Sequence, residues 1–184
     1  RLSLLPGCLW LDSVSRGPRD THGQPIGRYS FLTADPIKSL VAFAGDPDPW
    51  PVLAQWCDAL PSDHDPSLPS FQGGIAGLIG YEAATWLESV GMPEANDLPT
   101  PALSLGLYDW SIAFDHQLRK GWLISQGLSA TDPSQRFLVA VQRADYFQEY
   151  LFGNPDAETL SGDRTNVDST VTGLGGDELT GCGL

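Results

Sequence analysis

The distribution of aromatic residues limits which part of this chain can form a hydrophobic core. All 18 Phe, Trp and Tyr residues lie within residues 1–152, and residues 153–184 contain none. This last segment holds seven glycines and six acidic residues against a single basic residue, Arg164. Such a segment buries too little apolar surface to offset the entropy lost on ordering. We therefore predict one globular domain over residues 1–152, followed by a glycine- and acid-rich tail. The tail is expected to be disordered, to act as a linker, or to be a segment that lacks its partner.

The charge of the chain argues against two classes of partner. The net charge is −13, and Lys38 and Lys120 are the only lysines. Nucleic acids and anionic membranes recruit clustered basic residues, so we expect neither as a partner. The three cysteines Cys8, Cys57 and Cys182 form no Cys-x-x-Cys pair. This sparse, odd number fits a reducing compartment, which predicts a cytoplasmic protein. We expect Cys8 and Cys57 to pack into the core.

Strand-like patterns come in neighbouring pairs. Residues 8–11, 29–34, 40–44 and 71–80 are predicted strands, and the clearest one is residues 108–115, followed by a turn and a second arm at residues 121–125. In residues 108–115 the alternation predicts a buried face of Tyr108, Trp110, Ile112 and Phe114. It predicts a polar, wet face of Asp109, Ser111, Ala113 and Asp115.

Three helices are predicted between these groups of strands. Their apolar residues recur at helical spacing over residues 49–60, 81–90 and 133–144. Asp48 is the expected cap of the first helix, and Thr131 or Asp132 is the expected cap of the third. Paired strands with helices between the groups differ from a regular alternation of strand and helix. The predicted fold class is therefore α+β, with a mainly antiparallel sheet and flanking helices.

Local motifs give no catalytic or metal site. The glycine-rich segment 71–82 matches neither the phosphate-binding loop nor the dinucleotide fingerprint, so we interpret its glycines as sites of close packing. His22, His64 and His116 lie far apart in sequence and form no metal-binding pair. Arg28 opens an apolar strand and has two open roles. It can pair with an acid such as Asp35, or it can hold the carboxylate of a ligand.

Four segments together resemble a known family. They are Trp10-Leu11-Asp12-Ser13, Gly27-Arg28-Tyr29-Ser30-Phe31 with Ala34-Asp35-Pro36, the glycine-rich block 68–82 continuing to residue 89, and 106–110 continuing to 116. In order and approximate spacing they are similar to the N-terminal region of component I of aminodeoxychorismate synthase. The same architecture occurs in component I of anthranilate synthase, and the Tyr108-Asp109-Trp110 run favours the aminodeoxychorismate branch. The resemblance covers about residues 4–145.

The resemblance implies a fold and an activity. The family fold is an α/β/β/α sandwich assembled from N- and C-terminal halves. The family reaction converts chorismate, with ammonia from a glutamine amidotransferase partner, to 4-amino-4-deoxychorismate on the route to 4-aminobenzoate and folate. Magnesium assists at the chorismate site. The catalytic residues and magnesium ligands belong to the C-terminal half, so the resemblance implies no catalytic residue, no metal and no cofactor site in this chain, and no turnover by the chain alone.

The N-terminal half of the family carries a tryptophan pocket. The resemblance places Leu11 and Ser13 in its first wall and Arg28, Tyr29 and Ser30 in its second. Ser13 can bond the polar head of the amino acid, while Leu11 and Tyr29 can enclose an indole ring. L-Tryptophan is therefore a candidate ligand.

Two alternatives to this identification stay open. The chain can be a fragment from the anthranilate branch, or a non-catalytic module that binds an amino acid or docks a subunit. A fragment should expose a large apolar sheet face, for which Trp110, Ile112 and Phe114 are the candidates, whereas a free-standing module should close its own core.

Overall fold

The structure, a computed structural model, describes residues 2–12, 21, 23, 27–61, 64–90, 100–130, 132–153 and 167–171. Two sheets, two α-helices and three short 3₁₀ segments make up this part of the chain. The strands are β1 (Leu9–Leu11), β2 (Tyr29–Thr33), β3 (Lys38–Ala42), β4 (Gly74–Ile79), β5 (Leu103–Tyr108), β6 (Trp110–Asp115), β7 (Lys120–Ser125) and β8 (Val167–Val171). The helical segments are η1 (Leu2–Leu4), α1 (Trp50–Ala59), η2 (Tyr81–Trp86), η3 (Pro133–Gln135) and α2 (Arg136–Phe152).

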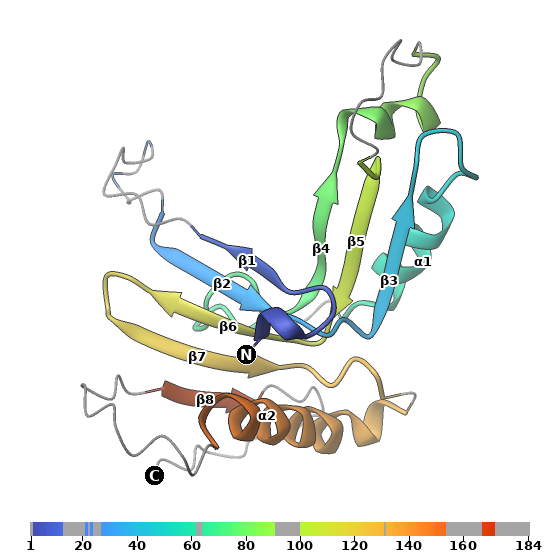
Figure 1. The fold of residues 1–184 in the computed structure, drawn as a ribbon. Helices are drawn as coiled ribbons and strands as arrows, with labels where there is room; N and C mark the ends of the chain where they lie inside the picture. The colour runs from blue at the N-terminus through green and yellow to red at the C-terminus, as the bar shows by residue number, and fades with distance from the viewer. Residues whose placement is uncertain are drawn as a thin grey trace.

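The two sheets stand at a steep angle to each other, like the arms of an L (Figure 1). The five-stranded sheet has the order β1-β2-β6-β7-β8, and the three-stranded sheet has the order β3-β5-β4. All strand pairs are antiparallel except β7 with β8. The predicted α+β class with a mainly antiparallel sheet is confirmed.

The predicted strand over residues 108–115 is divided between the two sheets. Tyr108 ends β5 in the three-stranded sheet, Trp110 begins β6 in the five-stranded sheet, and only Asp109 lies between them. The alternating pattern runs through this junction without a break, which is why the sequence predicts a single strand. The sharp change of direction is set by the long-range pairing partners of each half, which alternation does not report.

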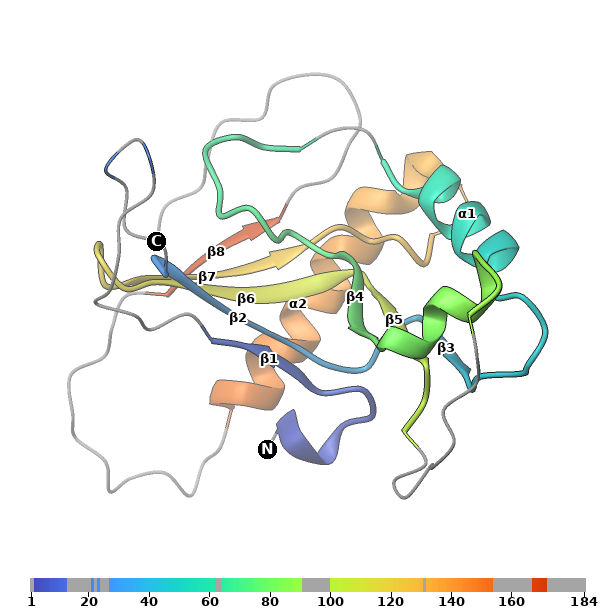
Figure 2. The same ribbon diagram turned by 90° about the horizontal axis from the view of Figure 1, so that it is seen from above.

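Helix α2 covers one face of the five-stranded sheet. Trp110, Leu123, Ala144 and Phe147 form the buried centre of this layer, with Leu32 and Ile112 packed against it. The helix lies below the sheet in Figure 1 and crosses beneath its strands in the view from above (Figure 2). Trp110 is fully buried, so it is not part of an open apolar face as the fragment hypothesis suggested.

The face of β6 that was predicted to be wet is buried. The side chains of Asp109, Ser111, Ala113 and Asp115 are all 0% exposed. The segment 64–73 covers part of this face: Leu68 packs against Ala113, and the Phe71 carbonyl accepts a hydrogen bond from Ser111 Oγ at 2.9 Å. The prediction was wrong because distant segments cover this face, and Ser111 and Asp115 find hydrogen-bond partners in those segments instead of in water.

Helix α1 covers only one face of the three-stranded sheet. Its Leu53 and Trp56 pack against Leu103, Leu105 and Leu107 of β5. On the opposite face, Val41 and Leu78 flank Ser104 in the strand register and are 55% and 53% exposed. Exposed apolar side chains therefore lie on this face of the three-stranded sheet.

Two of the helix predictions need correction, and the predicted cap at Asp132 is confirmed. Residues 81–90 contain the short 3₁₀ segment η2 and not an α-helix. Asp48 accepts a hydrogen bond from the Trp50 N–H at 2.9 Å, although Pro49 holds the cap position of α1. Asp132 caps η3, which leads into α2, by accepting from the Ser134 N–H. The second correction concerns the cap position only, since the carboxylate of Asp48 does bind the first turn.

The cysteines differ from expectation, and one strand is described within the predicted tail. Cys8 and Cys57 are exposed free thiols and not core residues, because Cys57 lies on the solvent side of α1. In the tail predicted to be disordered, Val167–Val171 form β8 beside β7. Its β-branched residues suit a strand, and the edge of β7 offers them a pairing partner. The domain boundary at residue 152 stays a prediction.

The glycine-rich segment serves close packing, as predicted. Gly77 has a φ of +148°, which side-chain-bearing residues rarely adopt. A Cβ atom at this position would collide with the Ser104 carbonyl oxygen of β5. The backbones of β4 and β5 therefore fit together only because residue 77 lacks a side chain.

Candidate functional site

Two of the predicted ligand residues share one face of the five-stranded sheet. Leu11 lies opposite Phe31 in the register of β1 and β2. Tyr29 is two residues before Phe31 on the same strand, and their ring centroids are 6.0 Å apart. Since alternate residues of a strand point to the same side, Leu11, Phe31 and Tyr29 form one apolar strip. Ser13, the remaining residue of the predicted first wall, lies outside the described residues.

Arg28 is held by a buried carboxylate at the end of this strip. Its Nε donates to Asp115 Oδ2 at 2.7 Å, and its Nη2 lies 2.6 Å from the same oxygen. Asp115 Oδ1 accepts from the Gln117 and Leu118 N–H groups. The Arg28 guanidinium also lies over the Tyr29 ring, 4.9 Å from its centroid. Arg28 therefore pairs with an acid, as one of its two predicted roles required, but that acid is Asp115 and not Asp35.

The electrostatics of this pair favour the charged forms of both groups. The hydrogen bond to Asp115 raises the pKa of Arg28 above its ordinary value. Burial alone would raise the pKa of Asp115, but the hydrogen bonds from Arg28, Leu118 and Gln117 outweigh it, so the pKa of Asp115 lies below its ordinary value. A ligand carboxylate at Arg28 would have to compete with this partner.

Ser30 points to the opposite face from Tyr29. Its Oγ donates to Asp12 Oδ1 at 2.6 Å and lies 2.6 Å from His116 Nε2. Because the single hydroxyl proton goes to Asp12, the second contact needs an N–H on His116 Nε2. The serine is central and the imidazole does not bond the carboxylate, so this is not the arrangement of a hydrolase triad. The predicted pocket residues are therefore divided between two faces of the sheet.

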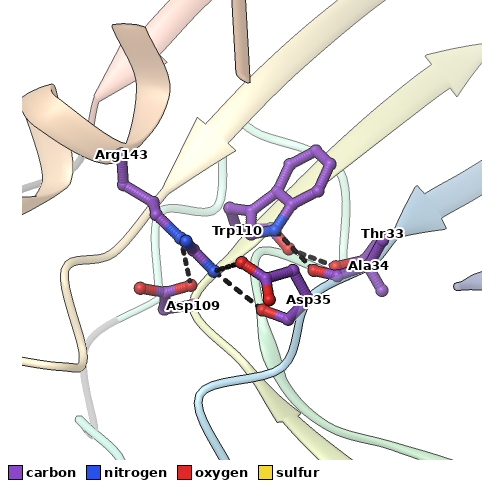
Figure 3. Close-up of polar contacts among 6 residues, drawn as sticks. All are labelled: Thr33, Ala34, Asp35, Asp109, Trp110 and Arg143. Atoms are coloured by element: carbon purple, nitrogen blue, oxygen red, sulfur yellow. Dashed lines mark hydrogen bonds and ion pairs between the residues drawn. The ribbon is translucent and has the colours of Figure 1, made fainter. Parts of the chain in front are cut away.

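A second polar cluster lies where the two sheets meet (Figure 3). Arg143 of α2 donates through Nε to Asp109 Oδ1 at 3.2 Å, and its Nη2 lies 2.9 Å from Asp35 Oδ2. The same Nη2 donates to the Asp35 carbonyl oxygen at 2.7 Å. Burial raises the pKa of Asp109, and the attraction of Arg143 offsets this only in part. Asp109 Oδ2 is buried without a hydrogen-bond partner among the described residues.

The sequence analysis missed this second cluster. Its three members are separated by long stretches of chain, and no local motif links an acid between two strands to an arginine on a distant helix. The one available signal was Asp109 itself, a carboxylate inside an otherwise apolar run.

One surface hollow, of about 440 Å³, lies on α2. It is lined by Asp145, Gln148, Glu149, Phe152 and Gly153. None of the predicted ligand residues belongs to this hollow.

Neither a metal-binding cluster nor a membrane-spanning helix occurs among the described residues. Within them, no three His, Cys, Asp or Glu side chains come together to hold a metal ion. No helix in the same part of the chain is long and apolar enough to cross a membrane.

Comparisons with known proteins give several relatives. The chain is 36% identical to aminodeoxychorismate synthase component 1 of Salmonella typhimurium over 55% of its length, and 32% identical to the protein of that name from Escherichia coli over 82%. It is 32% identical to anthranilate synthase component 1 of Synechocystis over 56% of its length. These matches span only 25%, 40% and 23% of the three relatives. No family model matches.

A solved structure supports the fold. The crystal structure of anthranilate synthase component I from Streptococcus pneumoniae matches 75% of this chain and 33% of its own, with a TM-score of 0.54 and 23% sequence identity. The chain thus has the fold of about one third of that protein.

Proposed function

Since the chain is a relative of the component I proteins of aminodeoxychorismate and anthranilate synthases, we propose that it is the N-terminal part of such an enzyme. The parent reaction joins ammonia from a glutamine amidotransferase to chorismate and gives 4-amino-4-deoxychorismate for 4-aminobenzoate and folate synthesis. The observation that carries this proposal is the match over 82% of the chain to 40% of the Escherichia coli protein. We place it in the cytoplasm, in keeping with the exposed free thiols of Cys8 and Cys57.

Of the two branches, we propose that the chain belongs to the aminodeoxychorismate branch, and the anthranilate branch is the alternative. Identities reach 36% over 55% of the chain in the first and 32% over 56% in the second. The difference is small, and the resemblance assigns the residues that separate the two branches to the C-terminal half of the family. A chimera in which this chain replaces the matching segment of the Escherichia coli protein therefore tests the place of the chain in the family and not its branch. The chimera should form 4-amino-4-deoxychorismate from chorismate and ammonia in the presence of magnesium, and a folded chimera without turnover would contradict the proposal.

The chain alone is proposed to be inactive. The resemblance assigns the catalytic residues and the magnesium ligands to the part of the family that this chain does not match. The purified 184-residue chain should therefore give no enzymatic turnover with chorismate, ammonia and magnesium. The chimera serves as the positive control for the assay. Turnover by the isolated chain at an ordinary enzymatic rate would refute this part of the proposal.

The open face of the three-stranded sheet supports a partial enzyme more than a free-standing module. A chain that closes its own core leaves few large apolar patches on a sheet. Here Val41 of β3 and Leu78 of β4 both pair with Ser104 of β5, and both side chains are more than half exposed. Binding of a hydrophobic dye should be strong for the parent chain and clearly weaker after Val41→Thr with Leu78→Thr. Weak binding by the parent chain would favour the module.

A tryptophan pocket is the one ligand site that we propose for this chain. Leu11 and Tyr29 supply an apolar strip for an indole ring, and Arg28 lies at its end. Ser30 points to the other face, so its part in the pocket is indirect, through the packing of β2. Calorimetry with L-tryptophan at millimolar concentration should detect weak binding that Tyr29→Ala removes. Absence of heat in the parent chain and in the chimera would argue against the pocket.

A further inference from the structure

The chain passes between the two sheets at two short crossings, and each crossing carries an aspartate. The first crossing, from β2 to β3, contains Asp35, and the second, from β5 to β6, is Asp109 alone. The crossings contact each other directly. Trp110 Nε1 donates to the Ala34 carbonyl at 2.8 Å, and Thr33 Oγ1 donates to the Trp110 carbonyl at 2.7 Å (Figure 3).

Arg143 binds both crossings from outside the sheets. Its Nε faces Asp109, and its Nη2 bonds both the carboxylate and the carbonyl oxygen of Asp35. The guanidinium also lies over the Phe147 ring, 4.8 Å from its centroid, which fixes it against α2. A planar guanidinium offers several donors in a rigid fork and so can hold two acids in a set geometry.

Apolar packing links the sheets much less than it links each sheet to its own helix. The cluster beneath the five-stranded sheet, around Trp110 and Phe147, shares no residue with the cluster around Leu103 and Trp56. Neutral contacts also bridge the sheets. The Tyr108 hydroxyl donates to the Gly7 carbonyl, Ser111 Oγ donates to the Phe71 carbonyl, and the Phe71 ring meets Phe31 edge-on.

The backbone at Asp35 indicates that the first crossing is held under constraint. Asp35 has a φ of +53°, a left-handed conformation that is uncommon outside glycine. Such residues persist where surrounding contacts fix them. Here the contacts are the two bonds from Arg143 and the hydrogen bond from the Asp35 N–H to the Pro6 carbonyl at 2.7 Å.

We propose that Arg143 is a hinge lock: by binding Asp35 and Asp109 at once, it sets the angle between the two sheets. Loss of the guanidinium frees the sheets to move relative to each other while each sheet and its helix keep their own packing. This inference concerns the folded chain and does not depend on the proposed enzymatic role.

The two exposed cysteines allow a direct test. Cys8 precedes β1 of the five-stranded sheet, and Cys57 lies on α1, which packs on the three-stranded sheet. In a Cys182→Ser variant, nitroxide labels are attached to Cys8 and Cys57. Pulsed electron paramagnetic resonance then measures the distance between the five-stranded sheet and the unit formed by α1 and the three-stranded sheet. We expect a narrow distance distribution in this parent and a broader or shifted one after Arg143→Met.

Matched variants separate a hinge effect from general loosening. Arg136→Met removes the same charge from the same helix and should leave the distribution unchanged. Asp35→Asn removes one arm of the lock, and asparagine tolerates the left-handed backbone, so this variant should fold and broaden the distribution. If Arg143→Met does not fold, Asp35→Asn decides the question. A folded Arg143 or Asp35 variant with the parent distribution, or equal broadening in Arg136→Met, would overturn the proposal.

Discussion

The indole ring of Trp110 stacks on the phenyl ring of Phe147, with ring centroids 3.5 Å apart and ring planes inclined by 18°. Both side chains are fully buried. The contact joins the first residue of β6 to the C-terminal half of α2, so it fastens the helix to the sheet close to the junction between the sheets.

Replacement of Phe147 by alanine should therefore be strongly destabilising. Replacing a buried phenylalanine by alanine lowers the free energy of unfolding by about 3–5 kcal/mol, because apolar burial is lost and a cavity remains. Urea denaturation followed by tryptophan fluorescence measures this loss. Phe152→Ala, at a side chain 62% exposed on the same helix, should change stability by only about 0.5 kcal/mol. Similar losses at both positions would show that the Trp110–Phe147 stack contributes no more to stability than an exposed side chain of the same helix.

The Arg28–Asp115 pair should make stability depend on pH in the acidic range. The pKa of Asp115 is lower in the folded chain than its ordinary value. Its contribution to stability is therefore fully present above the ordinary carboxyl pKa and is lost as the pH falls through the folded value. The difference in unfolding free energy between the parent chain and Asp115→Asn should shrink as the pH is lowered from neutrality. A difference that stays constant down to the acid transition would contradict this assignment.

Asp109 should show the opposite dependence. Burial raises its pKa in the folded chain, so the protonated form favours folding. The stability that protonation adds is fully present below the ordinary carboxyl pKa and is lost as the pH rises through the folded pKa. Asp109→Asn mimics the protonated form, so its stability relative to the parent should rise as the pH increases toward neutrality. Chemical denaturation at a series of pH values tests this, and a relative stability that falls over that range would exclude the predicted direction.

Gly77→Ala should disrupt the pairing of β4 with β5. The positive φ and the close approach of the Ser104 carbonyl both oppose a Cβ atom at this position. The expected loss is more than about 1 kcal/mol of unfolding free energy. Gly45→Ala is the matched control, because Gly45 also has a positive φ, +96°, but nothing lies within 4 Å of its added Cβ. The excess loss at residue 77 measures the steric contact, and equal losses would assign the whole effect to backbone conformation.

Local sequence patterns predicted most of the strands and the fold class. Residues 9–11, 29–33 and 120–125 carry their strand signals within a few neighbours, and Asp132 caps the start of the third helical region as expected. The family resemblance was also readable, because the glycine-rich block and the Tyr108-Asp109-Trp110 run occur in a fixed order. The second predicted helix was shorter than its periodicity suggested, since η2 ends at Trp86.

The candidate site was less predictable. The sequence left two roles open for Arg28, pairing with an acid such as Asp35 or holding a ligand carboxylate. It did not identify Asp115, 87 positions away, as the partner. Tyr29 and Ser30 were assigned to one pocket, although neighbouring strand residues point to opposite faces. The cluster around Arg143 left one local signal, the carboxylate of Asp109 inside an otherwise apolar run.

The sequence alone determined which residues alternate along each strand, where helices begin, and which family the chain resembles, because these properties depend on neighbours in the chain. Only the tertiary structure decided which face of a strand is covered, which acid meets which arginine, and where the strand bends at Asp109. The sequence of a strand does not decide which of its two faces is buried, because burial depends on the distant segments that pack on each face. At β6, α2 buries one face and residues 64–73 bury part of the other, so even its carboxylates lie inside the protein.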